Sequence, residues 1–150
     1  MSGAPRFSLI IPAYNEEAYL ARLLDSVERA PVRYAGGRES VEVIVADDGS
    51  TDATAGIARE RGCRTIAAEA RCIAQARNAG ARAARGAVLA FVDADSQVHP
   101  ETFSVIDRLL DSGSVIGGTT GASSSDSHRD GGAPSRPSRC PGWRSGGWAP

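Results

Sequence analysis

Short apolar runs alternate along this chain with amphipathic helical patterns, and this alternation constrains the fold more than any other feature. The run at 7–11 is typical of a strand that is buried on both faces, 41–46 predicts a second buried strand, and 88–92 predicts a strongly apolar one. A weaker run at 63–67 predicts one further strand. Polar clusters follow these runs, which places loops at their carboxyl ends.

Helical spacing of apolar residues fills the intervals between these runs. Expected helix boundaries come from capping and breaking residues: Asn15 begins the first helix, Pro31 stops it, and Pro100 opens the last one. The expected helices are 15–30, 53–61 ended by Gly62, 73–85 ended by Gly86, and 100–112 ended near Gly113. Val115 and Ile116 could begin one more strand. Strands that alternate with helices predict an α/β fold with a mostly parallel sheet covered on both faces.

The two ends of the chain differ in composition. Residues 1–120 have the apolar content of one packed domain, whereas 121–150 contain no Val, Ile, Leu, Met or Phe and are rich in Ser, Gly, Pro and Arg. We therefore expect 121–150 to be a disordered tail. All the basic side chains are Arg and none is Lys, a bias that fits a GC-rich genome. The tail could then be a wrong reading frame or the product of a truncated gene model.

Charge and hydropathy exclude several classes of partner. The formal net charge of -1 gives no electrostatic attraction to nucleic acid or to an anionic membrane. No stretch approaches the roughly 20 apolar residues of a membrane-spanning helix, and the first residues lack the apolar core of a signal peptide. The expected location is the cytoplasm.

The loop after the first run argues against two common nucleotide-binding motifs. A dinucleotide-binding dehydrogenase would carry GxGxxG there, but this chain has Pro12-Ala13-Tyr14-Asn15-Glu16. No GxxxxGK[ST] phosphate loop occurs either. Another α/β fold that handles nucleotides is needed.

Two acidic clusters follow predicted strands and should lie on the same edge of the sheet. Asp93 and Asp95 form a DxD pattern that could hold a divalent cation together with phosphate and water oxygens. Alternatively, either one caps the turn before the helix at Pro100. The cluster 47–52 (DDGSTD) could be an ordinary loop in which Ser50 or Thr51 caps a helix, or a carboxylate there could accept a ring N–H from uracil.

Taken in order, the segments IIPAYNE, VADDGSTD, ARNAGARAARG and AFVDADS resemble the N-terminal half of family 2 glycosyltransferases, over residues 7–120. The resemblance implies a GT-A fold, a Rossmann-like α/β/α sandwich that would be incomplete here. It also implies a nucleoside diphosphate sugar as donor, UDP-linked by preference, held with Mg²⁺ or Mn²⁺. The reaction implied is metal-assisted and inverting transfer to an acceptor that the sequence does not identify.

The resemblance also assigns residues on the nucleoside side of the site. Matching the motifs position by position, Pro12, Tyr14 and Glu16 would lie around the base and ribose. Asp48 would accept the uracil N–H, with Asp47 beside it.

On the diphosphate side, the match makes Asp95 the principal metal ligand and places Asp93 toward the ribose or the metal. Arg77 and Asn78 match the ARN segment, which would lie beside the diphosphate. A plain surface charge on a helix is the alternative for Arg77.

The family pattern stops after residue 120, and with it the region that would supply the acceptor pocket and the general base. We identify no catalytic base in this chain, so enzymatic activity of the chain alone stays open. The alternatives are a non-catalytic module that binds a nucleotide-sugar and a non-functional fragment, with a nucleotidyltransferase a more distant third. An incomplete sandwich should also expose apolar surface.

Overall fold

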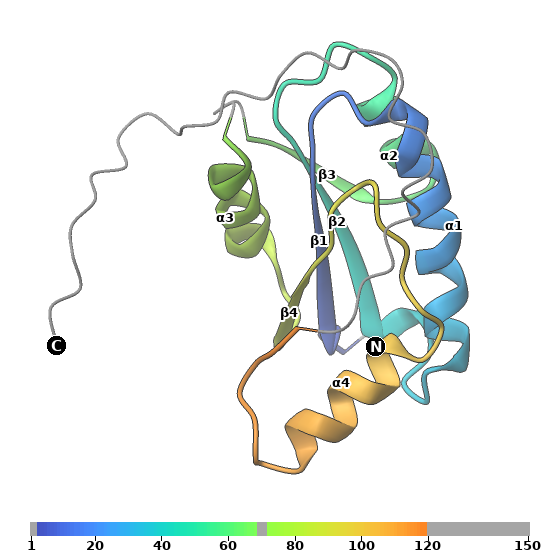
Figure 1. Cartoon of the computed structure of the whole chain (residues 1–150), viewed down its shortest axis with the longest axis vertical. Coiled ribbons are helices and arrows are strands. Elements are labelled where there is room, and N and C mark those ends of the chain that lie inside the picture. The colour runs from blue at the N-terminus through green and yellow to red at the C-terminus, as the bar shows by residue number, and fades with distance from the viewer. Residues whose placement is uncertain (1–2, 69–71, 120–150) are drawn as a thin grey trace, which may run out of the picture.

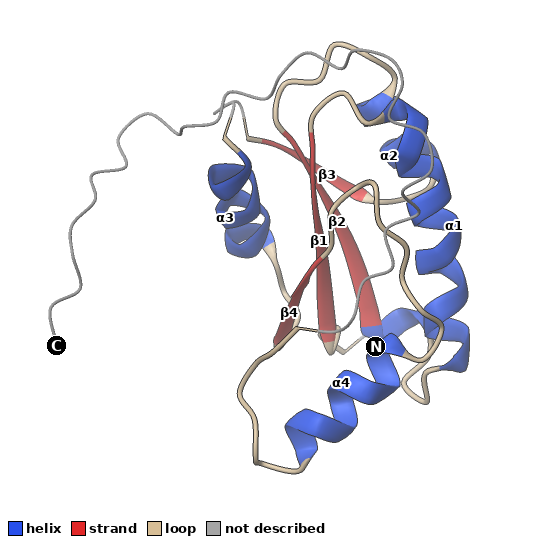
Figure 2. Cartoon of the chain, viewed as in Figure 1, coloured by secondary structure: helices blue, strands red, loops and turns tan. Residues whose placement is uncertain are grey.

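A computed structural model describes residues 3–68 and 72–119. They form a four-stranded, fully parallel sheet in the order β3-β2-β1-β4 (Figures 1 and 2). The strands are β1 (Phe7–Ala13), β2 (Val41–Asp47), β3 (Arg64–Ala67) and β4 (Val88–Phe91). The predicted parallel α/β fold is confirmed, whereas the expected disorder of 121–150 and the boundary at 120 lie outside the described residues.

Helices cover both faces of the sheet and make an α/β/α arrangement (Figure 2). The helices are α1 (Glu17–Arg33), α2 (Thr54–Glu60), α3 (Ile73–Ala83) and α4 (Thr102–Asp111), with a short 3₁₀ turn η1 (Arg38–Ser40). Helices α1 and α2 pack together on one face, and α3 packs on β1 and β2 from the other (Figure 1). In the described part of the chain, no helix is both long and apolar enough to cross a membrane.

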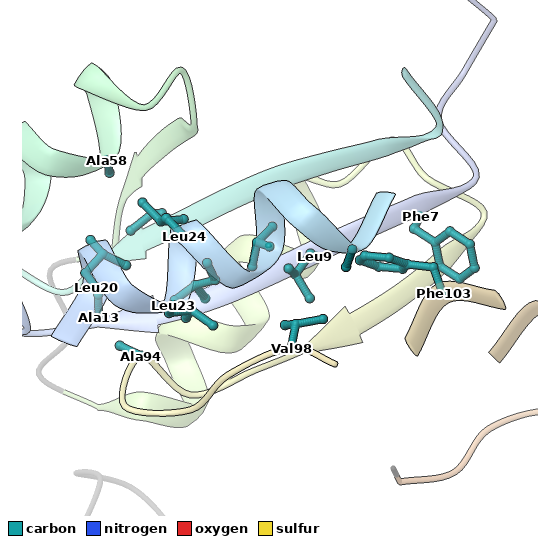
Figure 3. Close-up of a cluster of buried hydrophobic side chains, with 14 residues drawn as sticks. Phe7, Leu9, Ala13, Leu20, Leu23, Leu24, Ala58, Ala94, Val98 and Phe103 are labelled. Carbon is teal, nitrogen blue, oxygen red and sulfur yellow. The ribbon is translucent and has the colours of Figure 1, made fainter. Parts of the chain in front are cut away.

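Strand β1 runs through the middle of the sheet, and every residue in it is buried. Phe7, Leu9 and Ile11 belong to the cluster that packs under α1, because alternate side chains of a strand point to the same face (Figure 3). On the opposite face, Ile10 lies against Gly80 of α3, where a β-carbon would collide with it. The continuous apolar run therefore reflects a strand that is covered on both sides.

Helix α4 is fastened to the amino end of β1. The ring of Phe103 lies 5.1 Å from that of Phe7, which in turn meets Tyr34 edge-on at 5.5 Å. Asp107 accepts hydrogen bonds from Arg6 Nε at 2.8 Å and from the Tyr34 hydroxyl at 2.7 Å. These contacts tie the helix after the DxD segment to the start of the sheet.

Some predicted boundaries were wrong. Helix α1 does not stop at Pro31 but runs on to Arg33; Pro31 lacks the N–H for one intrahelical bond, but its burial offsets part of that cost. Gly86 does not end α3, which ends at Ala83; it is needed because a β-carbon there would lie 2.6 Å from the backbone of Phe7 and Ser8.

In the described residues Val115 and Ile116 form no strand. Strand β4 pairs with β1 on one side, and within the described residues no strand lies on its other side. Leu89 and Phe91 point to the face on which α3 packs mainly against β1 and β2, and they are 44% and 48% exposed. The expected exposed apolar surface is therefore present.

Candidate functional site

The candidate site lies where β1, β2 and β4 end. The chain leaves β1 toward β2 on one side and later returns to the other side of β1 as β4, so the order of strands reverses beside β1. In parallel α/β sheets ligands bind at the carboxyl edge beside such a reversal. The loops that follow these strands are 14–16, 48–53 and 92–101.

The ends of β1 and β2 are held together by the backbone. Asp48 N donates to Ala13 O at 2.9 Å, and Asp48 itself is buried at 6% exposure. Asp47 accepts from Ser50 N at 3.2 Å through its carboxylate, which closes the turn of its own loop. Tyr14 is 37% exposed beside them. The predicted base side thus combines a buried carboxyl group with a partly exposed aromatic ring.

Residues 15–17 and 50–54 bond to each other across the two loops, and we call this set of contacts the loop interlock. Asn15 has a left-handed backbone with φ 50°. Its N–H donates to Ser50 Oγ at 2.9 Å, and its Oδ1 accepts from Thr51 N at 2.8 Å. The sequence had suggested that Asn15 caps α1, but its side chain bonds to Thr51 instead. Neither Ser50 nor Thr51 caps α2.

The same interlock satisfies the N-termini of α1 and α2. Glu16 N donates to Thr54 Oγ1 at 2.8 Å, and Glu17 N donates to the Asp52 carboxylate at 3.1 Å. In return, Ala53 N donates to the Glu17 carboxylate at 3.0 Å. Each helix start is capped by a side chain from the other loop, since unpaired N–H groups at a helix start need acceptors.

These bonds act on the protonation of Asp52. Burial opposes ionisation, but hydrogen bonds from the Thr54 hydroxyl, Thr54 N and Glu17 N outweigh burial and lower the pKa of Asp52 below its usual range. The carboxylate that links both helices is therefore ionised at neutral pH.

At the end of β4, Arg77 and Asp93 form an ion pair between helix and strand. The distance from Arg77 Nη2 to Asp93 Oδ1 is 2.7 Å, with both side chains about half-exposed. Asp95 and Asn78 are exposed nearby in sequence. Among the described residues, no group of three or more His, Cys, Asp or Glu side chains could hold a metal by itself.

The loop that carries Asp93 and Asp95 is pinned to α1. Buried Ser26 accepts from Val98 N at 2.9 Å and donates to Leu23 O at 2.6 Å. Ala94 and Val98 are buried in the core cluster (Figure 3). Ala94 therefore anchors the loop between Asp93 and Asp95, and both carboxylates remain open to solvent.

The structure joins some predicted site residues directly and not others. Arg77 contacts Asp93, and the loops bearing Tyr14 and Asp48 are bonded together. Pro12 is buried within β1 and Glu16 is buried at the start of α1. A half-open cavity of about 270 Å³ lies toward the amino ends of β2 and β3, lined by Val43 and Cys63 among others, away from this edge.

Sequence reasoning missed the roles of Asn15, Asp52 and Thr54. Their bonds join residues that are 35 to 38 positions apart in the chain. No periodic pattern connects such positions. The only available signal was the presence of capping-type residues in both loops.

A parallel sheet with this reversal of strand order defines an α/β domain whose ligand site lies at the carboxyl edge, where the acidic loops of this chain gather. The chain belongs to the Glycosyl transferase family 2, whose model matches residues 8–144. The match continues to residue 144, beyond residue 120, where the motifs alone had indicated that the family pattern stops.

Named relatives support this assignment. The chain is 33% identical over 104 residues to the uncharacterized glycosyltransferase EpsJ of Bacillus subtilis, covering 66% of this chain and 28% of the relative. It is 37% identical over 106 residues to validoxylamine A glucosyltransferase of Streptomyces hygroscopicus subsp. limoneus, covering 67% and 22%. The chain thus spans less than a third of the length of these relatives.

Solved structures of glycosyltransferases share the fold. TarS of S. aureus in complex with UDP-GlcNAc matches with a TM-score of 0.63 and 30% identity, over 71% of this chain and 31% of that one. The mannosyltransferase PcManGT of Pyrobaculum calidifontis, in complex with GDP-Man and Mn²⁺, matches with a TM-score of 0.59 and 27% identity, over 72% and 33%. The fold is therefore GT-A, as the resemblance implied.

Proposed function

We propose that this chain forms the donor-binding part of a metal-assisted, inverting glycosyltransferase that uses a UDP-sugar. The observation that carries the proposal is the shared carboxyl edge, where the loop bearing buried Asp48 and the ion pair of Arg77 and Asp93 lie on either side of β1. A nucleoside diphosphate needs these two kinds of group: one for the base and one for the phosphates. Relatives with bound UDP, UDP-GlcNAc and GDP-Man support the class of donor.

On the base side, Asp48 would accept the uracil ring N–H. Burial of this residue at 6% exposure favours recognition of a base edge, because a hydrogen bond shielded from water discriminates better than an exposed one. Tyr14, with Pro12 and Glu16 behind it, would pack beside the base and ribose. Asp47 would act indirectly, since it closes the turn that carries Asp48.

On the phosphate side, Arg77 would contact the diphosphate, with Asn78 beside it. Asp95 and Asp93 fit a site for Mg²⁺ or Mn²⁺, because both are exposed carboxylates at one strand end. Too few protein ligands converge to form a closed cage, so phosphate and water oxygens would complete the coordination. When bound, the cation would supply charge stabilisation to the departing diphosphate.

Within this scheme the residues of this chain bind and orient the donor. Arg77 would hold the diphosphate while the bond between the diphosphate and the anomeric carbon of the sugar breaks. Asp48 would fix the nucleoside end of the donor. In an inverting transfer a general base removes the proton of the acceptor hydroxyl as that oxygen attacks. We assign that base to no residue of this chain, and we propose that it belongs to a region contributed from outside residues 3–119.

The test is calorimetric titration of UDP into the purified chain, with and without Mn²⁺, beside Asp95→Ala. We expect binding that depends on the metal and disappears in Asp95→Ala. Asp111→Ala is the matched control, since Asp111 is an exposed carboxylate on α4 at the other end of the sheet. Absence of UDP binding by a folded wild-type chain, or equal loss in both variants, would sink the proposal.

A further inference from the structure

We infer that Asn15 is a positioning residue that sets the nucleobase specificity of the donor site through the loop interlock. The inference rests on the proposed function, because it concerns how Tyr14 and Asp48 are presented to the base. Asn15 follows Tyr14 directly, and its partners Ser50 and Thr51 follow Asp48 closely. One residue thus connects the two loops that carry the groups expected at the base.

The backbone of Asn15 explains why this residue type is suited to the position. Its φ of 50° is left-handed, a conformation that Asn, Asp and Gly adopt at little cost and other residues avoid. In this conformation its N–H reaches Ser50 while its Oδ1 accepts from Thr51. Donor and acceptor of one residue therefore both engage the opposite loop.

The rest of the interlock makes this connection stiff. The bonds from Glu16 N to Thr54 and from Glu17 N to Asp52 hold the start of α1, and the bond from Ala53 N to Glu17 holds the start of α2. Asp48 N is also bonded to Ala13 O. Against this fixed background, the bond between Thr51 N and Asn15 Oδ1 sets how the 48–51 turn sits relative to Tyr14.

A loosened turn should weaken discrimination between bases more than it weakens folding. UDP presents a ring N–H to Asp48, whereas the cytosine of CDP has no proton on that ring nitrogen. If Asp48 is held in place, UDP is favoured over CDP. If the turn moves, the hydrogen bond to uracil is lost and the two nucleotides bind alike.

Two substitutions at position 15 separate the bond from the backbone shape. Asn15→Gly keeps the left-handed backbone but removes Oδ1, and Asn15→Asp keeps both. Calorimetry with Mn²⁺ at about 0.15 M salt, where surface charges are screened beyond ~8 Å, gives Kd for UDP and CDP with each variant. Melting temperatures and binding stoichiometry report whether each variant is folded.

We expect Asn15→Gly to reduce the ratio of the CDP Kd to the UDP Kd by about tenfold with stoichiometry unchanged, and Asn15→Asp to restore it. A role in folding alone would lower stoichiometry or melting temperature and leave the ratio as it is. An unchanged ratio in Asn15→Gly, with UDP still bound by the wild type, would overturn this inference and leave the proposed function standing. A wild-type chain that binds neither nucleotide would overturn both.

Discussion

Arg77 Nη2 lies 2.7 Å from Asp93 Oδ1, so helix α3 and the end of strand β4 are joined by an ion pair. Both side chains are about half-exposed, with exposed fractions of 41% and 51%. Pairs of this kind stabilise a fold by ~0–1 kcal/mol. The guanidinium can therefore exchange its carboxylate partner for a phosphate at little cost in folding.

Arg77→Gln should raise the Kd for UDP by about tenfold or more and leave the Kd for uridine unchanged, since a lost hydrogen bond to a charged group costs ~1.5–3 kcal/mol. Calorimetry with both ligands measures the difference. Arg82→Gln, on the last turn of the same helix, is the control and should change neither value. Equal weakening of uridine and UDP would contradict the placement of Arg77 at the diphosphate.

Acid should destabilise the junction of α4 with β1. The hydrogen bond from Tyr34, reinforced by Arg6, lowers the pKa of Asp107 below its usual value of 3.8 despite partial burial. A lowered folded-state pKa gives stability that is complete above the unfolded pKa and lost as pH falls through the folded one. The urea concentration at the unfolding midpoint should therefore decrease as the pH is lowered from about 4 to the folded-state pKa of Asp107.

Asp107→Asn should flatten this acid dependence and lower stability at pH 7. Asp111→Asn is the control, because that carboxylate is 70% exposed and pairs with Arg6 at 3.2 Å only at the surface. An unaltered pH profile in Asp107→Asn would show that other carboxylates dominate acid unfolding.

Gly86→Ala should destabilise the chain by ~1–3 kcal/mol, because its β-carbon would lie 2.6 Å from backbone atoms of β1 that cannot move aside. Gly56→Ala on α2 meets nothing within 4 Å and should stabilise the helix by ~0.5–1 kcal/mol. Urea unfolding of both variants tests the pair. Equal effects of the two substitutions would contradict the close packing at Gly86.

Cys63 should react slowly with iodoacetamide in the folded chain. Burial raises the pKa of this thiol to about 11, so ~0.1% is thiolate at pH 8, against roughly a quarter for a thiol of ordinary pKa. Mass spectrometry of the peptide containing Cys63 should show alkylation at least a hundredfold slower than in urea, given about that ratio of thiolate. Fast alkylation of the folded chain would show that the site opens readily.

The sequence predicted the order of elements well because each is encoded locally. Strands such as Val88–Phe91 are apolar runs, and the helices carry apolar residues at helical spacing. Pro31 was misleading because proline disfavours a helix without forbidding it, and α1 continues through this buried proline to Arg33. Gly86 was misleading because a glycine beside a helix end can be required by packing instead.

The candidate site was predictable only in its outline. The positions of Asp48, Asp93 and Asp95 follow from polar clusters at strand ends, which must share one edge in a parallel sheet. The partners of Asn15 and Asp52 did not follow, since hydrogen bonds between separate loops leave no periodic trace in the sequence. The assigned roles of these acidic residues remain predictions that the nucleotide titrations test.

Strand β4 has consequences for how the chain behaves in solution. Among the described residues, no strand pairs with its outer edge. The segment Val88-Leu89-Ala90-Phe91 contains no charged residue or proline that would oppose pairing with a strand from another molecule. The β4 edges of two molecules can pair with each other, or β4 can pair with a strand from another polypeptide. Association of this kind depends on mass action, so the thermal midpoint of the chain should rise with its own concentration.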